Sequence, residues 1–227
     1  SSIAQGANTS ATGVAAIAIG TENNATNSQA TALGTLSNAH GIASTAIGSA
    51  ANALGGCATA IGVLVNATGN YSIAQGHFAN ASGVESISIG NASNVTGNQS
   101  IGIGVGNQVH GHNSGAFGDP SVINANASYS VGNNNTLAAG QTDVFALGND
   151  ISTTTNNSVF LGSNSAYVAA GTSTKGLSAY ASETLGSGPG AITLNFAGGT
   201  PAGVVSVGAA GQERRIQNVA AGLLSNT

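Results

Sequence analysis

The chain has 227 residues, of which only 4% are charged and 4% aromatic, while 35 are glycine and 41% are nominally hydrophobic. Soluble globular domains usually carry about a quarter charged residues and a core of large apolar side chains, so an ordinary globular fold is a poor fit. The small formal net charge of -4 and the mean hydropathy of +0.17 also argue against a disordered chain. Small side chains in such number favour a fibre, a solenoid or a roll.

The few basic residues and the single cysteine limit which molecules the chain can bind and in which cellular compartment it is found. Lys175, Arg214 and Arg215 are the only lysine and arginine residues, so no basic stripe exists for nucleic acid or heparin. Cys57 has no partner for an internal disulfide, which fits an exported chain. No apolar run approaches the roughly 20 residues of a membrane-spanning helix, and Ser1 opens directly into the pattern, so we expect a soluble fragment or a mature form.

A repeat of fourteen residues runs through most of the chain. Glycines close the successive units at Gly6, Gly20, Gly34, Gly48, Gly62, Gly76, Gly90, Gly104, Gly118 and Gly132. The next step, to Gly148, is sixteen residues and indicates a two-residue loop insertion, after which Gly162 restores the period. A fixed period predicts a repeat architecture, here of twelve turns.

Each unit also has a second half. A second glycine follows most of the first ones after seven residues, and an apolar residue stands two positions before it, at Ala11, Ala25, Ala39, Ala53, Ala67, Ala81, Val95, Val109, Ile123 and Leu137. Each half offers about four residues of alternating pattern, too short for a helix and suited to a strand, and glycine is expected at tight corners that need a positive φ. Twelve parallel coils about 4.8 Å apart predict a thin all-β rod roughly 58 Å long.

Side chains alternate across the first strand of each unit, which separates two rows. The small row, which we place in the narrow gap inside each coil, is Ala4, Ala18, Ala32, Ala46, Ala60 and Ala74. The bulky row is Ile17, Ile19, Leu33, Ile47, Ile61, Ile87, Ile89, Ile101, Ile103, Phe117 and Val131. If the bulky row faces outward, it needs a cover, which predicts self-association, and three chains around an axis fit best. The reverse assignment, with the bulky row inside the roll, would weaken that prediction.

Two glutamines interrupt the bulky row. Gln5 and Gln75 place amide groups where apolar side chains are otherwise found. A buried amide needs hydrogen-bond partners, so three symmetry-related copies are expected to bond to one another at a trimer axis.

Two motifs resemble those of a known family. Asn157-Ser-Val-Phe-Leu-Gly162 and Gln99-Ser-Ile-Gly-Ile-Gly104 are similar to the Asn-Ser-Val-Ala-Ile-Gly repeat of YadA-like adhesin heads. Residues 205–222 resemble the neck that follows such heads, and every fixed position of the pattern Val-Ser-Val-Gly-x-x-Gly-x-Glu-Arg-x-Ile-x-Asn-Val-Ala-Ala-Gly is present. The chain therefore resembles a trimeric autotransporter adhesin.

The resemblance implies a left-handed parallel β-roll that forms a homotrimer on the bacterial cell surface and needs no cofactor. It divides the chain into a head of twelve repeats (1–162), a β-rich insert or capping element (163–203) and a neck (204–227) that leads to a coiled-coil stalk, with the membrane anchor outside this chain. The isoleucines and Leu33 of the bulky row would form the trimer core. The neck residues implied by similarity are Glu213, Arg214, Ile216, Asn218 and Val219, of which the first two would link subunits through charge-assisted hydrogen bonds.

No catalytic, metal or cofactor site is expected. The histidines are His40, His77, His110 and His112, and only the last two lie close, with no cysteine or acidic cluster to complete a zinc set. The glycines of residues 102–106 follow from the repeat and open no helix, so they predict no phosphate cradle. No serine sits in a Gly-x-Ser-x-Gly elbow that leads from a strand to a helix.

Adhesion is the function that the sequence favours, because many identical coil surfaces gain avidity from repetition. The resemblance implies host collagen, fibronectin, laminin or cell-surface receptors as ligands, and autoaggregation. Candidate binding faces are the insert and the coil corners around Asn23, Asn24, Asn91 and Asn94.

There are three alternatives to direct adhesion, and the sequence argues against the second and the third. The head could be a structural spacer that projects other adhesive domains. A hexapeptide-repeat acyltransferase would need coils of about eighteen residues, which the period contradicts. An ice-binding solenoid would need a long threonine ladder, whereas Thr31, Thr45 and Thr59 are followed in register by Ile73.

Overall fold

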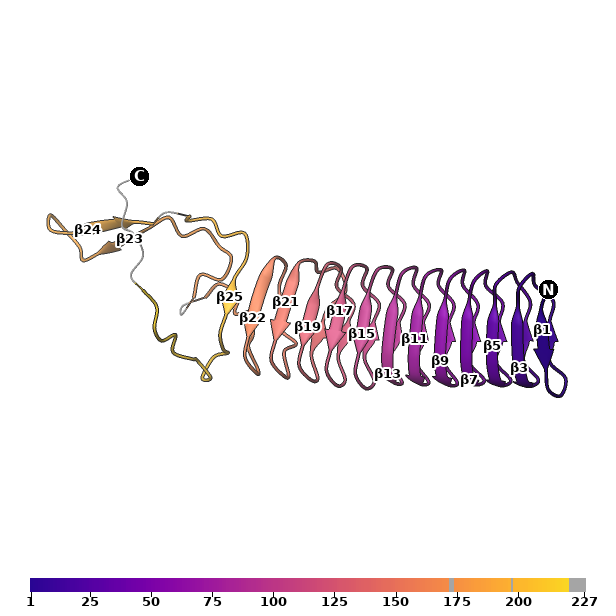
Figure 1. Ribbon diagram of the computed structural model, residues 1–227. Helices are drawn as coiled ribbons and strands as arrows, with labels where there is room; N and C mark the ends of the chain where they lie inside the picture. The colour runs from indigo at the N-terminus through magenta and orange to yellow at the C-terminus, as the bar shows by residue number, and fades with distance from the viewer. Residues whose placement is uncertain (172–173, 197, 221–227) are drawn as a thin grey trace.

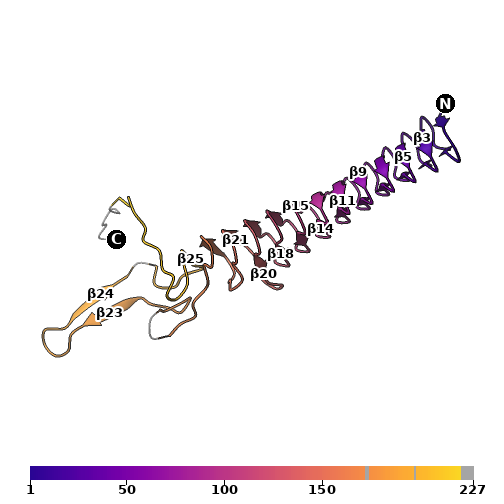
Figure 2. The same cartoon turned by 90° about the horizontal axis from the view of Figure 1, so that it is seen from below.

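The computed structural model describes residues 1–171, 174–196 and 198–220, and this part of the chain is all β with no helix. The strands coil into a rod, and a shorter, less regular segment follows it (Figures 1 and 2). Most strands belong to two long parallel sheets, one on each side of the rod, which we call sheet A and sheet B. No described helix could cross a membrane.

The twelve strands of sheet A within the rod are β1 (Ile3–Gln5), β3 (Ile17–Thr21), β5 (Thr31–Thr35), β7 (Thr45–Ser49), β9 (Thr59–Val63), β11 (Ile73–His77), β13 (Ile87–Asn91), β15 (Ile101–Ile103), β17 (Gly115–Phe117), β19 (Tyr129–Val131), β21 (Val144–Leu147) and β22 (Ser158–Leu161). Sheet B contains β2 (Ser10–Ala11), β4 (Asn24–Ala25), β6 (Asn38–Ala39), β8 (Asn52–Ala53), β10 (Asn66–Ala67), β12 (Asn80–Ala81), β14 (Asn94–Val95), β16 (Gln108–Val109), β18 (Val122–Ile123) and β20 (Thr136–Leu137). Beyond the rod lie β23 (Ser182–Leu185), β24 (Ile192–Asn195) and β25 (Val205–Ser206).

The parallel solenoid of fourteen-residue coils is confirmed. Each strand pairs with the equivalent strand of the next coil, so that Ala32 lies beside Ala46 in sheet A and Asn38 beside Asn52 in sheet B. A strand precedes or contains each of the twelve glycines of the period, whereas sheet B has ten strands and ends at β20. The last two coils therefore complete their second half without a described strand.

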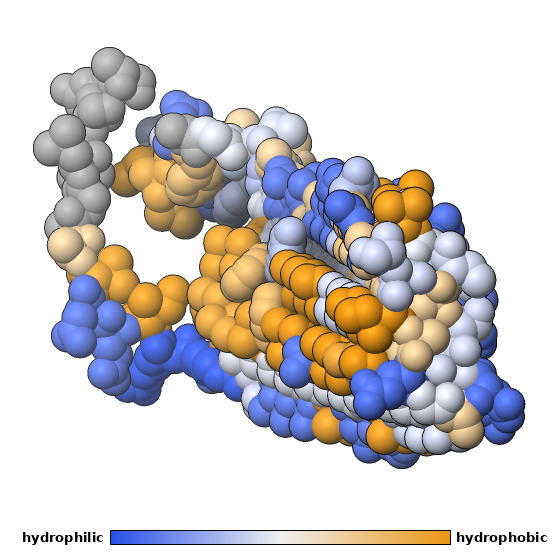
Figure 3. All heavy atoms as spheres, turned by 45° about the vertical axis from the view of Figure 1, so that its right-hand side comes forward, coloured by the Kyte–Doolittle hydropathy of each residue, from blue (hydrophilic) through white to orange (hydrophobic). Residues whose placement is uncertain are grey.

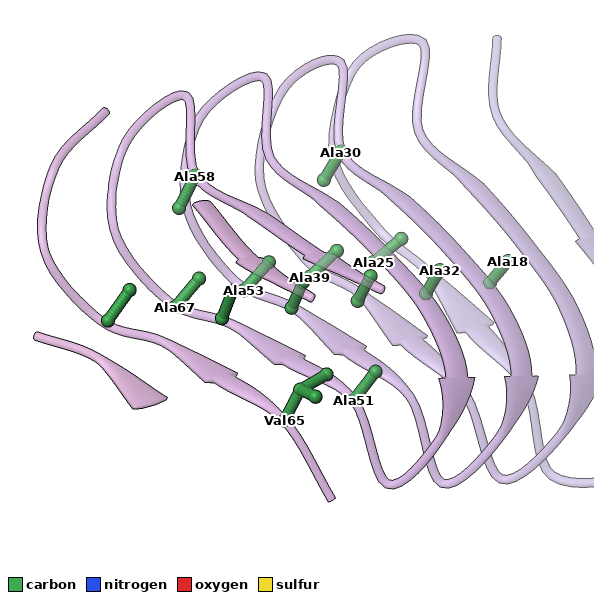
Figure 4. Packing of buried hydrophobic residues seen from close by; sticks show 14 of the residues in the cluster. Ala18, Ala25, Ala30, Ala32, Ala39, Ala51, Ala53, Ala58, Val65 and Ala67 are labelled. Atoms are coloured by element: carbon green, nitrogen blue, oxygen red, sulfur yellow. The ribbon is translucent and has the colours of Figure 1, made fainter. Parts of the chain in front are cut away.

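The core is a thin layer of small side chains between the two sheets. Ala18 and Ala32 from sheet A and Ala25 and Ala39 from sheet B are fully buried and project into this layer (Figure 4). Because alanine is short, the two strands of a coil can lie close together. Toward β22 the layer contains larger residues, and Phe160 is the largest fully buried side chain. The predicted small row is thus internal, except that Ala4 is exposed because only β3 flanks its strand.

The sequence predicted that glycine occupies the tight corners of each coil, and the structure places other residues there. The glycines that close the units do have positive φ, as at Gly62 (φ 133), but the tight corners are formed by other residues such as Leu36 (φ 57) and Ala43 (φ 53). The second glycine row has no positive φ. At Gly69 a Cβ would instead overlap the backbone carbonyl of Gly83 in the next coil. Glycine is therefore needed there because neighbouring coils approach closely, and not because a corner requires it.

The end of the rod is closed by a returning strand. β25 pairs in parallel with β22, so that Val205 lies beside Val159, and it becomes the thirteenth strand of sheet A. Between these two strands the chain forms an antiparallel hairpin, β23 and β24, which pairs with no other described strand.

Candidate functional site

The outer face of sheet A carries the bulky row. Ile17, Leu33, Ile47, Ile87, Ile89 and Ile101 are half-buried, and Ile19, Ile61 and Ile103 are exposed. Ile61 keeps 36% of its surface accessible although both neighbouring strands flank it. The alanines of the same strands point into the core, so the reverse assignment of the two rows is wrong.

The apolar face continues along the whole rod. Val131, Phe145 and Leu147 extend it to the last coils, and hydrophobic residues form rows along the side of the molecule (Figure 3). Gln75 is exposed on the same face, in register with Ile61 and with Ile89. A stripe of this length is unusual for a monomer, because large contiguous apolar patches generally mark interaction sites.

The outer face of sheet B is polar and carries a ladder of side-chain amides. Asn24 donates to Asn38, Asn38 to Asn52 and Asn52 to Asn66, at 3.0, 2.9 and 2.9 Å from Nδ2 to Oδ1. The ladder resumes from Asn80 to Asn94 (2.7 Å) and ends at Gln108 (3.0 Å). This ladder was not predicted from the sequence. The sequence does contain a sign of it, because asparagine occupies the same position of the repeat in six consecutive units, from Asn24 to Asn94.

Removing one amide from the ladder should weaken the rod. Asn52→Ala deletes the hydrogen bonds to Asn38 and to Asn66, and we expect a loss of about 1–2 kcal/mol of unfolding free energy, since each bond contributes roughly 1 kcal/mol at a partly exposed site. Asn52→Gln is the control, because Gln108 already occupies a position of the ladder. Denaturant unfolding of the two variants measures the difference. Equal stability of the alanine variant and the parent would show that the ladder is energetically neutral.

The coil corners proposed as a binding face are partly internal. Asn23 is fully buried, and its side chain donates to the carbonyl oxygens of Ile19 and Gly34 at 2.6 and 2.7 Å. Asn24 and Asn94 belong to the amide ladder, and only Asn91 is exposed. The prediction was wrong for Asn23, because a side chain that satisfies backbone groups inside a turn cannot be told from a surface asparagine by composition.

The histidines do not converge. The His110 ring bonds through Nδ1 with the Thr96 hydroxyl at 2.8 Å, and His112 Nδ1 accepts from the Asn98 backbone N–H at 3.0 Å. His40 and His77 lie on other coils and are exposed. Among the described residues no group of three or more His, Cys, Asp or Glu side chains could hold a metal ion.

Two of the predicted neck residues, Arg214 and Glu213, form hydrogen bonds within the same chain. Arg214 donates to the carbonyl oxygens of Ser163 (2.7 Å) and Val207 (2.9 Å). The carboxylate of Glu213 accepts a hydrogen bond from the Gly211 N–H, and this bond lowers the pKa of Glu213. These contacts are intrachain, so the link between subunits stays a prediction. Ile216, Asn218 and Val219 are exposed, and residues 221–227 of the neck lie outside the described residues.

Comparison with known proteins identifies the repeat. The YadA head domain repeat family matches residues 1–23, 11–37, 25–51, 39–63 and 67–94. Among solved structures, the C-terminal YadA-like domain of BPSL2063 from Burkholderia pseudomallei is 30% identical, with 52% of this chain and 42% of that chain covered and a TM-score of 0.29. This chain spans less than half of that protein's length. Curated proteins gave no match. The matched residues lie in the coils between β1 and β13, and this part of the solenoid is similar to the repeats of YadA heads.

Proposed function

We propose that this chain is the adhesive head of a trimeric autotransporter, exposed on the bacterial surface, and that three copies assemble with their sheet A faces inward. The observation that carries the proposal is the uncovered apolar face of sheet A, which runs from the first coils to the last. Its proposed members are Ile17, Ile19, Leu33, Ile47, Ile61, Ile87, Ile89, Ile101 and Ile103.

Burial energetics support this arrangement. Complete burial of an isoleucine side chain stabilises by roughly 1.5–3 kcal/mol, and these residues are already partly covered, so each adds a fraction of that amount. Nine such residues in each of three chains still contribute a large stabilising free energy in total. Gln75 would lie within the interface, where its amide can bond to the copies related by symmetry.

In such a trimer the outward surfaces are sheet B and the corners, which repeat every fourteen residues. A repeated surface in three copies binds multivalently, so weak contacts with an extended host polymer can sum to stable attachment. Host collagen, fibronectin, laminin or a cell-surface receptor is the proposed ligand, and copies on neighbouring cells would support autoaggregation. The proposed role is binding and not catalysis.

Binding to immobilised collagen, fibronectin and laminin tests the adhesive role. We expect the trimer to bind at least one of them, and a monomeric variant to bind on the order of 10²–10⁴-fold more weakly, because avidity is lost. A trimer that binds none of the three, and does not make cells that display it aggregate, would favour the spacer role instead.

A further inference from the structure

The hairpin beyond the rod has one polar and one apolar face. In the register of β23 and β24, Leu185 pairs with Ile192 and Glu183 with Leu194, so these four side chains share a face. The opposite face is polar and includes a contact between the hydroxyls of Thr184 and Thr193 at 3.1 Å. Leu185 and Ile192 are 54% and 61% exposed.

The base of this hairpin is ordered by contacts of its own. The Tyr180 and Phe196 rings stack at 5.2 Å, the Tyr180 hydroxyl donates to Glu183 at 2.7 Å, and Lys175 Nζ lies 5.1 Å from the centre of the Tyr180 ring. Nothing described covers the apolar face itself. A two-stranded hairpin alone is at best marginally stable in water, so this face needs a partner.

An open apolar groove lies at the same end of the rod. It has a volume of about 440 Å³. Its apolar lining residues are Ala166, Val168, Val205, Val207, Ala209 and Ala210, and Thr174, Ser206, Glu213 and Arg214 contribute polar groups. Ala166 and Val168 belong to the segment that leads from the last coil to the hairpin, and Val205 lies in the strand that follows it. The hairpin nevertheless extends away from the last coil in both Figure 1 and Figure 2, and it does not fill this groove.

We propose that the apolar face of the hairpin packs into the groove of the next copy in the trimer. One surface of the chain then binds a different surface of its neighbour, and such a contact closes into a ring when repeated about a threefold axis. This proposal rests on the trimer proposed above. It makes each subunit complete the end of its neighbour's rod.

Charge complementarity favours a second copy as the occupant. Arg214 lies at the groove, and its described hydrogen bonds go to backbone carbonyls and to the Ser165 hydroxyl, so the cation has no described carboxylate partner. Glu183 lies on the apolar face of the hairpin, beside Leu194. Docking would therefore bring a carboxylate to Arg214, one of the three lysine and arginine residues in this chain.

Photocrosslinking from the hairpin tests the contact. Leu194→Cys, in a Cys57→Ala background, is labelled with a benzophenone maleimide in the full chain fused after Thr227 to a trimeric coiled coil. Alanine is suitable at position 57, because Ala43 occupies the same corner one coil earlier with φ 53, close to the 56 of Cys57. The control is Thr193→Cys with the same label, since residue 193 points to the opposite face of the hairpin. Illumination, a denaturing gel and peptide mapping report which chain and which segment are linked.

The expected result is two- and three-chain bands on the order of tenfold stronger from position 194 than from position 193, because the two labels point to opposite faces. The linked peptides should come from residues 166–168 or 205–210. Crosslinks confined to one chain, or equal bands from both positions, would overturn the proposal. The molar mass of the unfused chain separates this failure from a failure to trimerise.

Discussion

Replacing Gly62 by alanine is expected to destabilise the rod by at least about 3 kcal/mol, well above the typical cost of a point substitution. Two causes add. The backbone of Gly62 has φ 133, a value that residues with a side chain rarely adopt. An added Cβ would also overlap the carbonyl oxygen of Gly76 in the next coil. Neither coil can move aside without breaking the parallel ladder on which both depend. The midpoint of denaturant unfolding measures the loss.

Gly56→Ala is the matched control for that substitution. Gly56 lies on the opposite turn of the preceding unit, its φ is not in the positive range, and a Cβ there would meet only the Asn70 side-chain oxygen at 3.6 Å. We expect this variant to be as stable as the parent. If Gly62→Ala were equally harmless, the close stacking of coils would be wrong at this position.

Introducing charge on the outer face of sheet A is expected to abolish assembly. Ile47→Asp combined with Ile89→Asp places two carboxylates from each chain in the proposed trimer core, and an unpaired buried charge costs several kcal/mol. Both positions are half-buried on the outer face of one chain, so the fold of the coil itself should tolerate the change. Light scattering is expected to report a monomer, with an unchanged β-sheet circular dichroism spectrum.

The same change on the other face is the control. Thr26→Asp combined with Thr68→Asp adds the same charge on the exposed surface of the sheet B side, away from the proposed core. This variant should remain a trimer. Loss of assembly in the control, or a trimeric mass for the Ile47 and Ile89 variant, would show that copies do not meet through sheet A.

The sequence predicted the architecture well because the repeat fixes it. Fourteen residues between equivalent glycines permit one short coil, and the alternation of Ala18 with Ile17 and Ile19 separates a row of small side chains from a row of bulky ones. The parallel pairing of short strands follows from those two facts. The face assignment could not be made from composition alone, because either row could have been internal.

Other features depend on contacts between coils, which the pattern of a single unit does not contain. Leu36 and Ala43 adopt positive φ, where glycine was expected, because the ladders on both sides hold these corners. Asn23 is buried because it bonds to the backbone of two coils, and the Asn24 to Gln108 ladder exists only once the coils are stacked. The hairpin of residues 182–195 lies where the period fails, so only its β character was predicted.

The molar mass of the unmodified chain in solution shows whether three copies assemble. We expect a mass near three times 21.6 kDa, stable on dilution, because the apolar face of sheet A must be covered. A stable mass of 21.6 kDa at high concentration would contradict it, since the exposed apolar face would then be tolerated by a single chain in water.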